Sequence, residues 1–285
     1  MTGANSGIGR AASLELARRG HEVWLLCRDP GRGAEARDAI ARDCGHDRVH
    51  LAVVDVSSLA SIRRFVRDFG SSRVDVLVHN AGVLPDQRHV TGEGVELTFA
   101  THVLGPFVLT SLLMERLSRS TDARVIFVAS GGLYLQRLEL SLLDVDAAAF
   151  DGTRAYANAK RAQVILAHVL AERFSSELPV TFASMHPGWV DTTALRDSLP
   201  RFHSMMRPWL RTAEEGADTV VWLAASERVR GSRGAFWFDR RVAPEYPFPW
   251  TRERPAVRQE LLAVCEKRGG LTLDSVRGGG PGPCA

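Results

Sequence analysis

The sequence predicts an α/β fold in which a parallel sheet is covered by helices on both faces. Two observations carry this prediction. Short apolar runs alternate along the chain with longer helical patterns, and a glycine-rich loop precedes the first of these patterns. Nearly continuous apolar runs are typical of strands buried on both faces. The alternation indicates right-handed βαβ units, and therefore a doubly wound Rossmann fold.

The elements follow one another at βαβ spacing. The sequence predicts strands over residues 22–27, 49–54, 74–78, 124–129 and 180–185, and helices over 8–19, 34–43, 59–69, 95–117, 155–174 and 213–225. Three prolines make 242–250 an extended segment, and 255–268 is expected to form one more helix. The Gly/Pro-rich end, 278–285, is expected to be disordered. We therefore expect a Rossmann-type domain over 1–240 and a C-terminal extension over 241–285.

Composition excludes several classes of protein. The 285 residues are 45% hydrophobic and 24% charged, with a formal net charge of +3, which gives no reason to expect a nucleic-acid partner. No apolar run reaches the length of a membrane span and the start does not resemble a signal peptide, so we expect a soluble, cytoplasmic protein. The cysteines form no CxxC pair and the histidines show no metal-ligand spacing, so no metal is expected. The cysteines are Cys27, Cys44, Cys265 and Cys284.

The glycine-rich loop at the start of the chain has the composition of a diphosphate-binding turn. Glycines permit a tight turn and let backbone N–H groups approach a phosphate, and the N-terminus of the following helix adds partial positive charge. Such a loop alone is equally consistent with a helix cap, but the strand expected at 22–27 gives it the context of a dinucleotide site. The residues expected to bind the dinucleotide here are Thr2, Gly3, Asn5, Ser6, Gly7, Ile8 and Gly9.

The end of the next strand predicts which dinucleotide is bound. A carboxylate there would accept a hydrogen bond from the ribose 2′-hydroxyl of NAD(H), but the chain has Cys27 followed by Arg28. The guanidinium of Arg28 suits a 2′-phosphate, so NADP(H) is preferred. NAD(H) remains the alternative, with Asp29 on the ribose.

A tyrosine and a lysine four residues apart form the candidate catalytic pair. Tyr156 and Lys160 lie in a predicted helix, where this spacing places both side chains on one face. A nearby ammonium is expected to lower the pKa of the phenol, which could then exchange a proton with an alcohol or carbonyl oxygen. Ser130 ends a predicted strand, where a hydroxyl could hold that oxygen.

Together these motifs resemble the short-chain dehydrogenase/reductase family, in its single-domain branch with a TGxxxGxG loop. The resemblance covers about residues 2–240, and within the family the chain looks most like the group named dehydrogenase/reductase SDR family member 12 and, more loosely, retinol-dehydrogenase-type reductases. It implies that Ser130, Tyr156 and Lys160 are catalytic and that Lys160 also binds the nicotinamide ribose. Further cofactor contacts implied by matching segments are Asp55, Val56, Asn80, Ala81, Gly82, Pro187, Gly188, Val190 and Thr192.

The resemblance also implies a reaction. A hydride would pass between the nicotinamide and a carbonyl or alcohol carbon, while Tyr156 donates or removes the proton on oxygen. In one departure from the family pattern, His102 stands where many members have a catalytic asparagine that holds a water. We expect this histidine to bind that water, to carry a proton and to tune the pH profile; the alternative is that it only fills space.

A second departure lies at the start of the chain. The family's first strand precedes the glycine loop in the middle of the sheet, but here Met1 directly precedes Thr2. We therefore expect that strand to be truncated, which would leave its two neighbours without a ladder partner. An upstream start that would supply the missing residues is one explanation, and a genuinely shortened protein is the other.

Substrate and assembly are less determined by the sequence. An apolar stretch follows the PG segment and predicts a lipophilic substrate lid, with 134–136 as the opposite wall; the alternative is an ordinary helix core. A second functional reading is a catalytically silent, nucleotide-binding sensor or scaffold. Family members commonly form homo-oligomers through the two long helices, but the sequence does not decide this here. The apolar residues are Leu195, Leu199, Phe202, Met205, Met206, Trp209 and Leu210.

Overall fold

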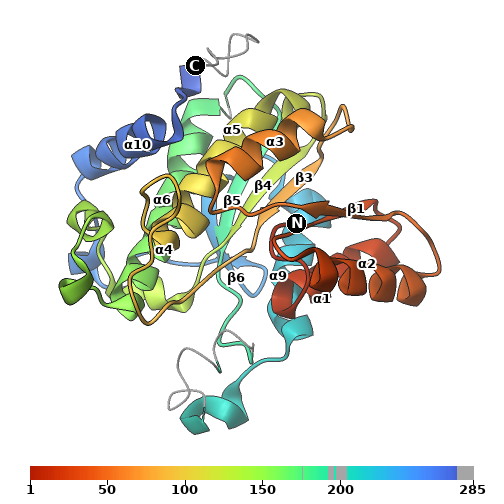
Figure 1. Cartoon of the computed structure of the whole chain (residues 1–285), viewed down its shortest axis with the longest axis horizontal. Coiled ribbons are helices and arrows are strands. Elements are labelled where there is room, and N and C mark those ends of the chain that lie inside the picture. The colour runs from red at the N-terminus through yellow and green to blue at the C-terminus, as the bar shows by residue number, and fades with distance from the viewer. Residues whose placement is uncertain (175, 192–195, 197–203, 275–285) are drawn as a thin grey trace.

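The computed structural model describes residues 1–274, apart from 175, 192–195 and 197–203, and has the predicted doubly wound α/β fold (Figure 1). Thr192 and three of the seven apolar residues of the predicted lid, Leu195, Leu199 and Phe202, lie outside the described residues. The predicted strand at 180–185 has the expected bounds, and the other four agree within two residues at each end. The strands are β1 Val23–Cys27, β2 Val49–Val53, β3 Val76–His79, β4 Ala123–Val128, β5 Val180–Met185, β6 Arg233–Phe238 and β7 Arg241–Val242.

The strands form two hydrogen-bonded groups. β1 and β2 pair in parallel, and the other group has the order β3-β4-β5-β6-β7, parallel except for the short final hairpin. The expectation that the space between β1 and β3 lacks a partner requires correction. Met1–Gly3 lie there: the Thr2 amide donates to Val78 O at 3.0 Å and the Gly3 amide to Leu26 O at 2.9 Å. These residues join the two groups at the end that faces the functional site.

Helices cover both faces of the sheet (Figure 1). On one face α1, α2 and α9 enclose an apolar core that includes Leu25, Ile126 and Val220; on the other, α3, α5 and α6 enclose a second core around Phe107 and Phe182. The helices are α1 Gly7–Arg18, α2 Pro30–Cys44, α3 Leu59–Asp68, α4 Leu97–Phe99, α5 Gly105–Ser118, α6 Gly152–Phe174, α9 Ala213–Ala225 and α10 Pro255–Gly269.

The helix predicted over 95–117 is interrupted. Glu96 accepts the first free amides of α4, a π-helical turn follows over Ala100–Leu104, and α5 then begins at Gly105. The interruption brings α5 against the loop after β2, where a Cβ on Gly105 would lie 1.9 Å from Val56 O. Contrary to the sequence-based expectation, Leu97–Ser118 is long and apolar enough for a membrane span, with a mean hydropathy of 1.6. However, 89% of its apolar window is buried in the fold, as in a core helix.

The C-terminal residues pack back onto the domain. The predicted helix at 255–268 is observed as α10, which lies on α5 and α6 with Leu261 and Cys265 buried. The Arg268 guanidinium pairs with Asp144 at 2.7 Å. The preceding segment includes β7, whose pairing with β6 was not predicted. These contacts place α10 over the two long helices.

Candidate active site

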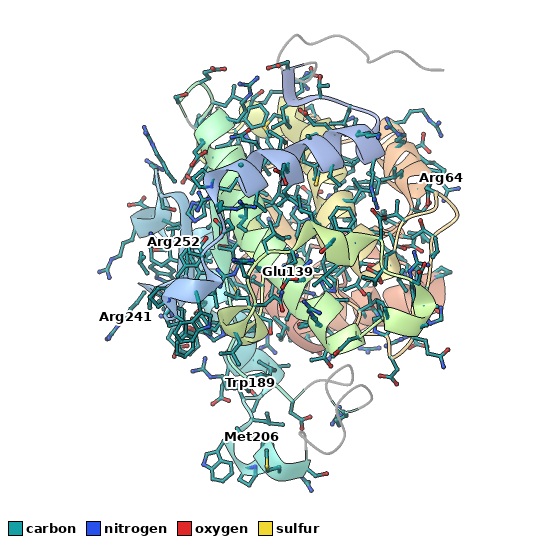
Figure 2. The ribbon with its side chains drawn as sticks, turned by 90° about the vertical axis from the view of Figure 1, so that its left-hand side faces the viewer. Arg64, Glu139, Trp189, Met206, Arg241 and Arg252 are labelled. Atoms are coloured by element: carbon teal, nitrogen blue, oxygen red, sulfur yellow. The ribbon has the colours of Figure 1, made fainter. Side chains whose placement is uncertain are left out.

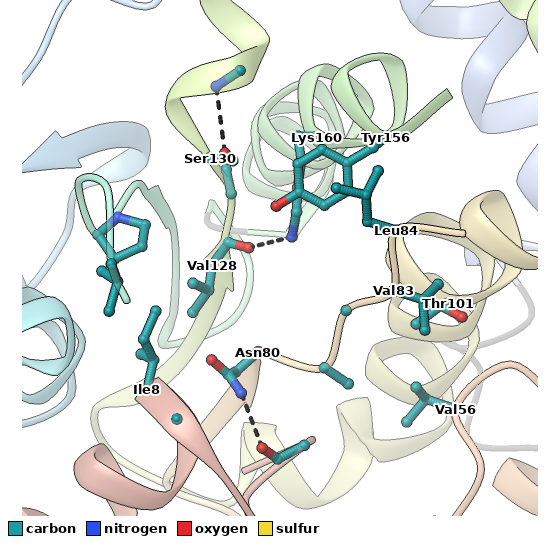
Figure 3. Close-up of a pocket in the computed structure, with 18 of the residues that line it drawn as sticks. Ile8, Val56, Asn80, Val83, Leu84, Thr101, Val128, Ser130, Tyr156 and Lys160 are labelled. Carbon is teal, nitrogen blue, oxygen red and sulfur yellow. Dashed lines mark hydrogen bonds between the residues drawn. The ribbon is translucent and has the colours of Figure 1, made fainter. Parts of the chain in front are cut away.

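A cavity of about 740 Å³ lies along the carboxyl ends of β1, β3 and β4, where an open α/β sheet binds its ligands (Figure 3). Residues from the glycine loop, from all of these strand ends and from α6 line it. The predicted site residues among them are Gly3, Asn5, Ser6, Gly7, Ile8, Arg28, Asp55, Val56, Asn80, Ala81, Gly82, Ser130, Tyr156, Lys160, Pro187, Gly188 and Val190.

The glycine loop is held against the segment after β3. The Asn80 side chain donates to Thr2 O at 3.1 Å and to Gly3 O at 3.2 Å, and the amides of Asn80 and Ala81 both donate to the Thr2 hydroxyl at 3.0 Å. Gly3 has φ +63° and approaches Ala81, while a Cβ on Gly9 would lie 2.4 Å from Gly3 O. Thus Thr2 and Gly9, predicted as cofactor contacts, are not among the lining residues and instead fix the shape of the loop.

This loop fits a dinucleotide diphosphate. Ser6 stands at the N-cap of α1 without a side-chain hydrogen bond to the helix, so it does not cap the first-turn amides. Free helix N-terminal amides attract phosphate. Gly7 has φ +50° and lines the cavity, so the backbone can approach a ligand closely.

The predicted catalytic residues meet at the other end of the cavity (Figure 3). Ser130 directly follows Ala129 at the end of the β4 strand, and its hydroxyl accepts from the Gly132 amide at 3.3 Å. Tyr156 and Lys160 project from the same face of α6. The Lys160 Nζ donates to Val128 O at 2.8 Å and lies 5.5 Å from the centre of the Tyr156 ring. A strand end and one helix therefore bring the hydroxyl, phenol and amine together.

Burial dominates the electrostatics of this cluster. It lowers the pKa of Lys160 to about 7. It also raises the pKa of Tyr156 above its usual value of 10, while a hydrogen bond with Ser130 acts in the opposite direction. The sequence-based expectation of a lowered tyrosine pKa is therefore wrong in sign, because desolvation of the phenolate outweighs the hydrogen bond with Ser130. The phenol remains protonated at neutral pH and is ready to donate.

Comparison with known proteins agrees with this site. A model of the short chain dehydrogenase family matches residues 1–141. Dehydrogenase/reductase SDR family member 12 of Bos taurus is 41% identical over 94% of this chain and 84% of its own length. The chain belongs to the short-chain dehydrogenase/reductase family. Retinol dehydrogenase 12 of Bos taurus is 35% identical over 93% of this chain and 85% of its own length.

A solved structure gives the same fold. An uncharacterised protein from Mycobacterium paratuberculosis superposes with a TM-score of 0.76 and 27% identity, over 95% of this chain and 92% of its own. The resemblance inferred from the motifs is thus confirmed, including the similarity to member 12 of the family. This short-chain dehydrogenase/reductase is an oxidoreductase.

His102 of this short-chain dehydrogenase/reductase lies in the π-helical turn, behind the cavity wall. Its Nε2 is 2.9 Å from Val83 O and 3.1 Å from the Val83 amide, and its ring packs on that of Tyr156 in a T-shaped arrangement. Burial, followed by the charge of Lys160, lowers the pKa of His102 well below 6.5, although the Val83 contact opposes this. The imidazole is therefore neutral, which removes the electrostatic basis for the expected proton-carrying role.

At the β1 end of the cavity, the lining includes Asp29, the residue expected to contact the ribose of NAD(H). Asp29 caps α2 by accepting from the Arg32 amide at 2.9 Å. Arg28 and Arg32 both line the cavity and are exposed. Arg32 was not predicted, although it lies in the first turn of α2, four positions after Arg28.

The substrate end contains residues that the sequence analysis missed. Asp151, Thr153 and Arg154 line the cavity just before Tyr156, and Thr153 lies one turn before it on α6, a signal that i,i+3 spacing could have revealed. On the predicted wall, Gln136 lines the cavity and Tyr134 does not; its ring instead packs on His186 and Phe236.

The described part of the predicted lid does not cover the cavity. Met205 and Trp209 are 65% and 71% exposed and are absent from the lining, and Figure 2 shows Met206 on a segment that projects from the body. Leu195, Leu199 and Phe202 lie outside the described residues. Trp189, which was not predicted, lines the cavity and is 43% exposed.

Proposed function

We propose that this short-chain dehydrogenase/reductase is an NADP(H)-dependent reductase of lipophilic carbonyl compounds. The observation that carries the proposal is the convergence of Ser130, Tyr156 and Lys160 at one end of a cavity whose other end is lined by the glycine loop and two arginines. A single cavity thus presents a proton donor at one end and groups suited to a phosphorylated dinucleotide at the other.

The chain's own residues would support reduction as follows. The cofactor, when bound, supplies hydride to the carbonyl carbon. The Ser130 hydroxyl holds the carbonyl oxygen, and Tyr156 donates its phenolic proton to that oxygen, so the C=O double bond becomes a C–OH group. Lys160, in its ammonium form, hydrogen-bonds the ribose and offsets the charge of the phenolate left behind. The raised pKa of Tyr156 favours this acid role.

Preference for NADP(H) is supported by charge at the adenosine end. Arg28 and Arg32 offer two guanidinium groups, whereas Asp29, which also lines the cavity, already accepts from the Arg32 amide with one of its two carboxylate oxygens. A 2′-phosphate gains charge-assisted hydrogen bonds from arginine, and a 2′-hydroxyl needs an acceptor. The balance favours the phosphate-bearing cofactor.

A lipophilic substrate is supported by the apolar residues at the catalytic end. Val83, Leu84, Leu135 and Trp189 line the cavity there, and Leu135 is 75% exposed at its mouth. Exposed apolar side chains that line a cavity favour an apolar ligand over a sugar. The relative named retinol dehydrogenase 12 also points to an apolar alcohol or aldehyde.

The first experiment is calorimetric titration with NADPH and NADH, followed by turnover on a panel of aldehydes and ketones of increasing apolar surface. We expect NADPH to bind more tightly and turnover to rise with apolar surface. Tyr156→Phe should lower kcat by about 10²- to 10⁴-fold while NADPH still binds. Binding without turnover across the panel, unaffected by Tyr156→Phe, would support the sensor reading instead.

A further inference from the structure

The largest of the fully buried side chains belongs to an arginine with no part in the reaction above. Arg161 follows catalytic Lys160 on α6 and is 0% exposed. A buried guanidinium is costly unless its donors are satisfied. Its contacts therefore indicate which parts of the fold it holds together.

The guanidinium joins two segments that are far apart in the sequence. Its Nε donates to Gln136 O at 3.1 Å, and one terminal nitrogen donates to Leu133 O and to Glu245 O, both at 3.0 Å. We define 131–139 as the wall loop, which begins directly after Ser130, and 243–253 as the C-terminal strap. Arg161 thus bonds the wall loop on one side and the strap on the other.

The aromatic ring of Tyr246, in the strap, packs against this arginine. The Tyr246 ring lies 4.6 Å from the Arg161 guanidinium carbon, a cation–π distance. The Tyr246 hydroxyl donates to the buried Glu253 carboxylate at 2.8 Å, and Arg258 donates to the same carboxylate at 2.7 Å. The position of the ring is therefore fixed by its own hydrogen bonds.

A second contact anchors the strap to α6. His168 Nε2 lies 2.6 Å from a Glu245 carboxylate oxygen, two helical turns beyond Arg161. On the wall-loop side, Asn158 accepts from the Glu139 amide at 2.9 Å and donates to Glu139 O at 3.0 Å. Figure 2 shows Glu139 and Arg252, one from each segment, on the same side of the molecule. One helix therefore holds both segments.

The wall loop belongs to the substrate end of the cavity. Gly132, Leu135 and Gln136 line it, together with Ser130 at the start of the loop. Among the described residues, the hydrogen bonds of Arg161 go to the wall loop and the strap, and none goes to the glycine loop or to Arg28 and Arg32. A change at Arg161 or in the strap therefore acts on the substrate side and leaves the cofactor side in place.

We propose that Arg161 is a positioning residue through which the C-terminal strap sets the shape of the substrate wall, and hence the selectivity for carbonyl compounds. The consequence for selectivity rests on the proposed function; the structural coupling does not. Residues more than a hundred positions after Ser130 thereby become determinants of substrate choice.

The test compares substitutions of Arg161 and of Tyr246 in the C-terminal strap with a matched control variant. Arg161→Met removes the donors, Arg161→Lys keeps the charge, and Tyr246→Ala removes the ring beneath it. Arg124→Met is the control, since Arg124 is also buried but donates to Leu223 O and Asp122. Amide hydrogen exchange by mass spectrometry is measured for peptides covering 131–139 and the glycine loop, alongside Kd for NADPH and KM and kcat for two carbonyl compounds of different size.

In Arg161→Met and Tyr246→Ala we expect exchange in 131–139 to become about tenfold faster, with the glycine loop unchanged. KM for the carbonyl should rise about tenfold, unequally for the two compounds, with Kd for NADPH within about twofold. Arg161→Lys should restore part of the effect. The proposal fails if amide exchange in the wall loop of these variants matches that of Arg124→Met. It also fails if their Kd for NADPH rises as much as their KM for the carbonyl. If the wild-type chain reduces no carbonyl, the proposed function fails, yet the exchange results still decide the coupling.

Discussion

The rings of His102 and Tyr156 pack in a T-shaped arrangement, with centroids 5.4 Å apart and planes at 90°. The same imidazole contacts the Val83 backbone, and a Cβ on Gly82 would lie 2.8 Å from its Cε1. His102 therefore connects the segment after β3, which lines the cofactor cavity, to the proton donor.

This contact predicts a role in positioning rather than in titration. We expect His102→Ala to lower kcat about tenfold, because Tyr156 loses this ring contact, with little change in Kd for NADPH. His102→Asn, which keeps a neutral hydrogen-bonding group, should retain most of the activity. Since burial holds the pKa of His102 well below 6.5, neither variant should remove a kinetic pKa between pH 6 and 8. Loss of such a pKa in His102→Asn would contradict this assignment.

From the lowered pKa of Lys160 we predict that the affinity for NADPH falls as the pH rises above 7. Its pKa of about 7 means that the ammonium is present below pH 7 and lost above it. The ribose and phosphates favour the ammonium, so binding takes up a proton, and Kd for NADPH should rise by up to about tenfold per pH unit between pH 7 and 9. The second pKa of a phosphate monoester is about 6, so the 2′-phosphate is about nine-tenths ionised at pH 7 and adds little pH dependence above it.

The control for this dependence is Lys160→Met, which should bind NADPH more weakly with little pH dependence over the same interval. Calorimetry in buffers of different ionisation enthalpy measures the proton uptake directly. Equal slopes of log Kd against pH in the wild-type chain and the variant would exclude Lys160 as the source.

The position of Arg28 in the cavity predicts that the protein prefers NADPH to NADH. Arg28→Met should raise Kd for NADPH by about 10- to 100-fold, the value of a charge-assisted contact to phosphate, with Kd for NADH within about twofold. Arg32→Met is the matched comparison from the same end of the cavity. An equal loss of affinity for both cofactors would place Arg28 outside the 2′-phosphate site.

Because α10 covers the two long helices α5 and α6, we predict that two copies of the chain do not pair through them and that the protein is a monomer. Helix α10 buries Leu261 and Cys265 against the α5 and α6 face through which family members commonly pair. We expect light scattering coupled to gel filtration to give a mass near 31.2 kDa. Because a Cβ on Gly269 would lie 2.8 Å from Val108, Gly269→Val should loosen α10 and cause concentration-dependent association. A wild-type dimer that buries α10 at its interface would refute the prediction.

Sequence patterns predicted an element with its correct bounds where one helical or strand pattern ran through the whole element. The strand at 180–185 and the helix at 213–225 were predicted with their observed bounds, since each is apolar with clear polar limits. β6 was missed because its six residues, RGAFWF, begin with an arginine and a positive-φ glycine, and a register shift interrupts its pairing with β5. The π-helical turn at Ala100–Leu104 has no periodic signature in the sequence.

The candidate site, like the fold, could be predicted from the sequence only in part. The spacing of Tyr156 and Lys160 identified two of its members, because helix geometry converts sequence separation into proximity. The sign of the tyrosine pKa could not be predicted, since it depends on how much water the fold excludes. Contacts such as those of Arg161 join residues 25 to 84 positions apart and are set by tertiary structure alone.

Trp189 gives the protein an optical probe of its own active site. Of the six tryptophans in the chain, it alone lines the cavity, and it follows the Pro187–Gly188 segment expected at the nicotinamide. Reduced nicotinamide absorbs light in the range where tryptophan emits, so energy transfer from Trp189 would report the arrival of the cofactor without any attached dye. The other five tryptophans emit as well, so the share of this quenching that Trp189→Phe removes is the signal from the catalytic end of the cavity.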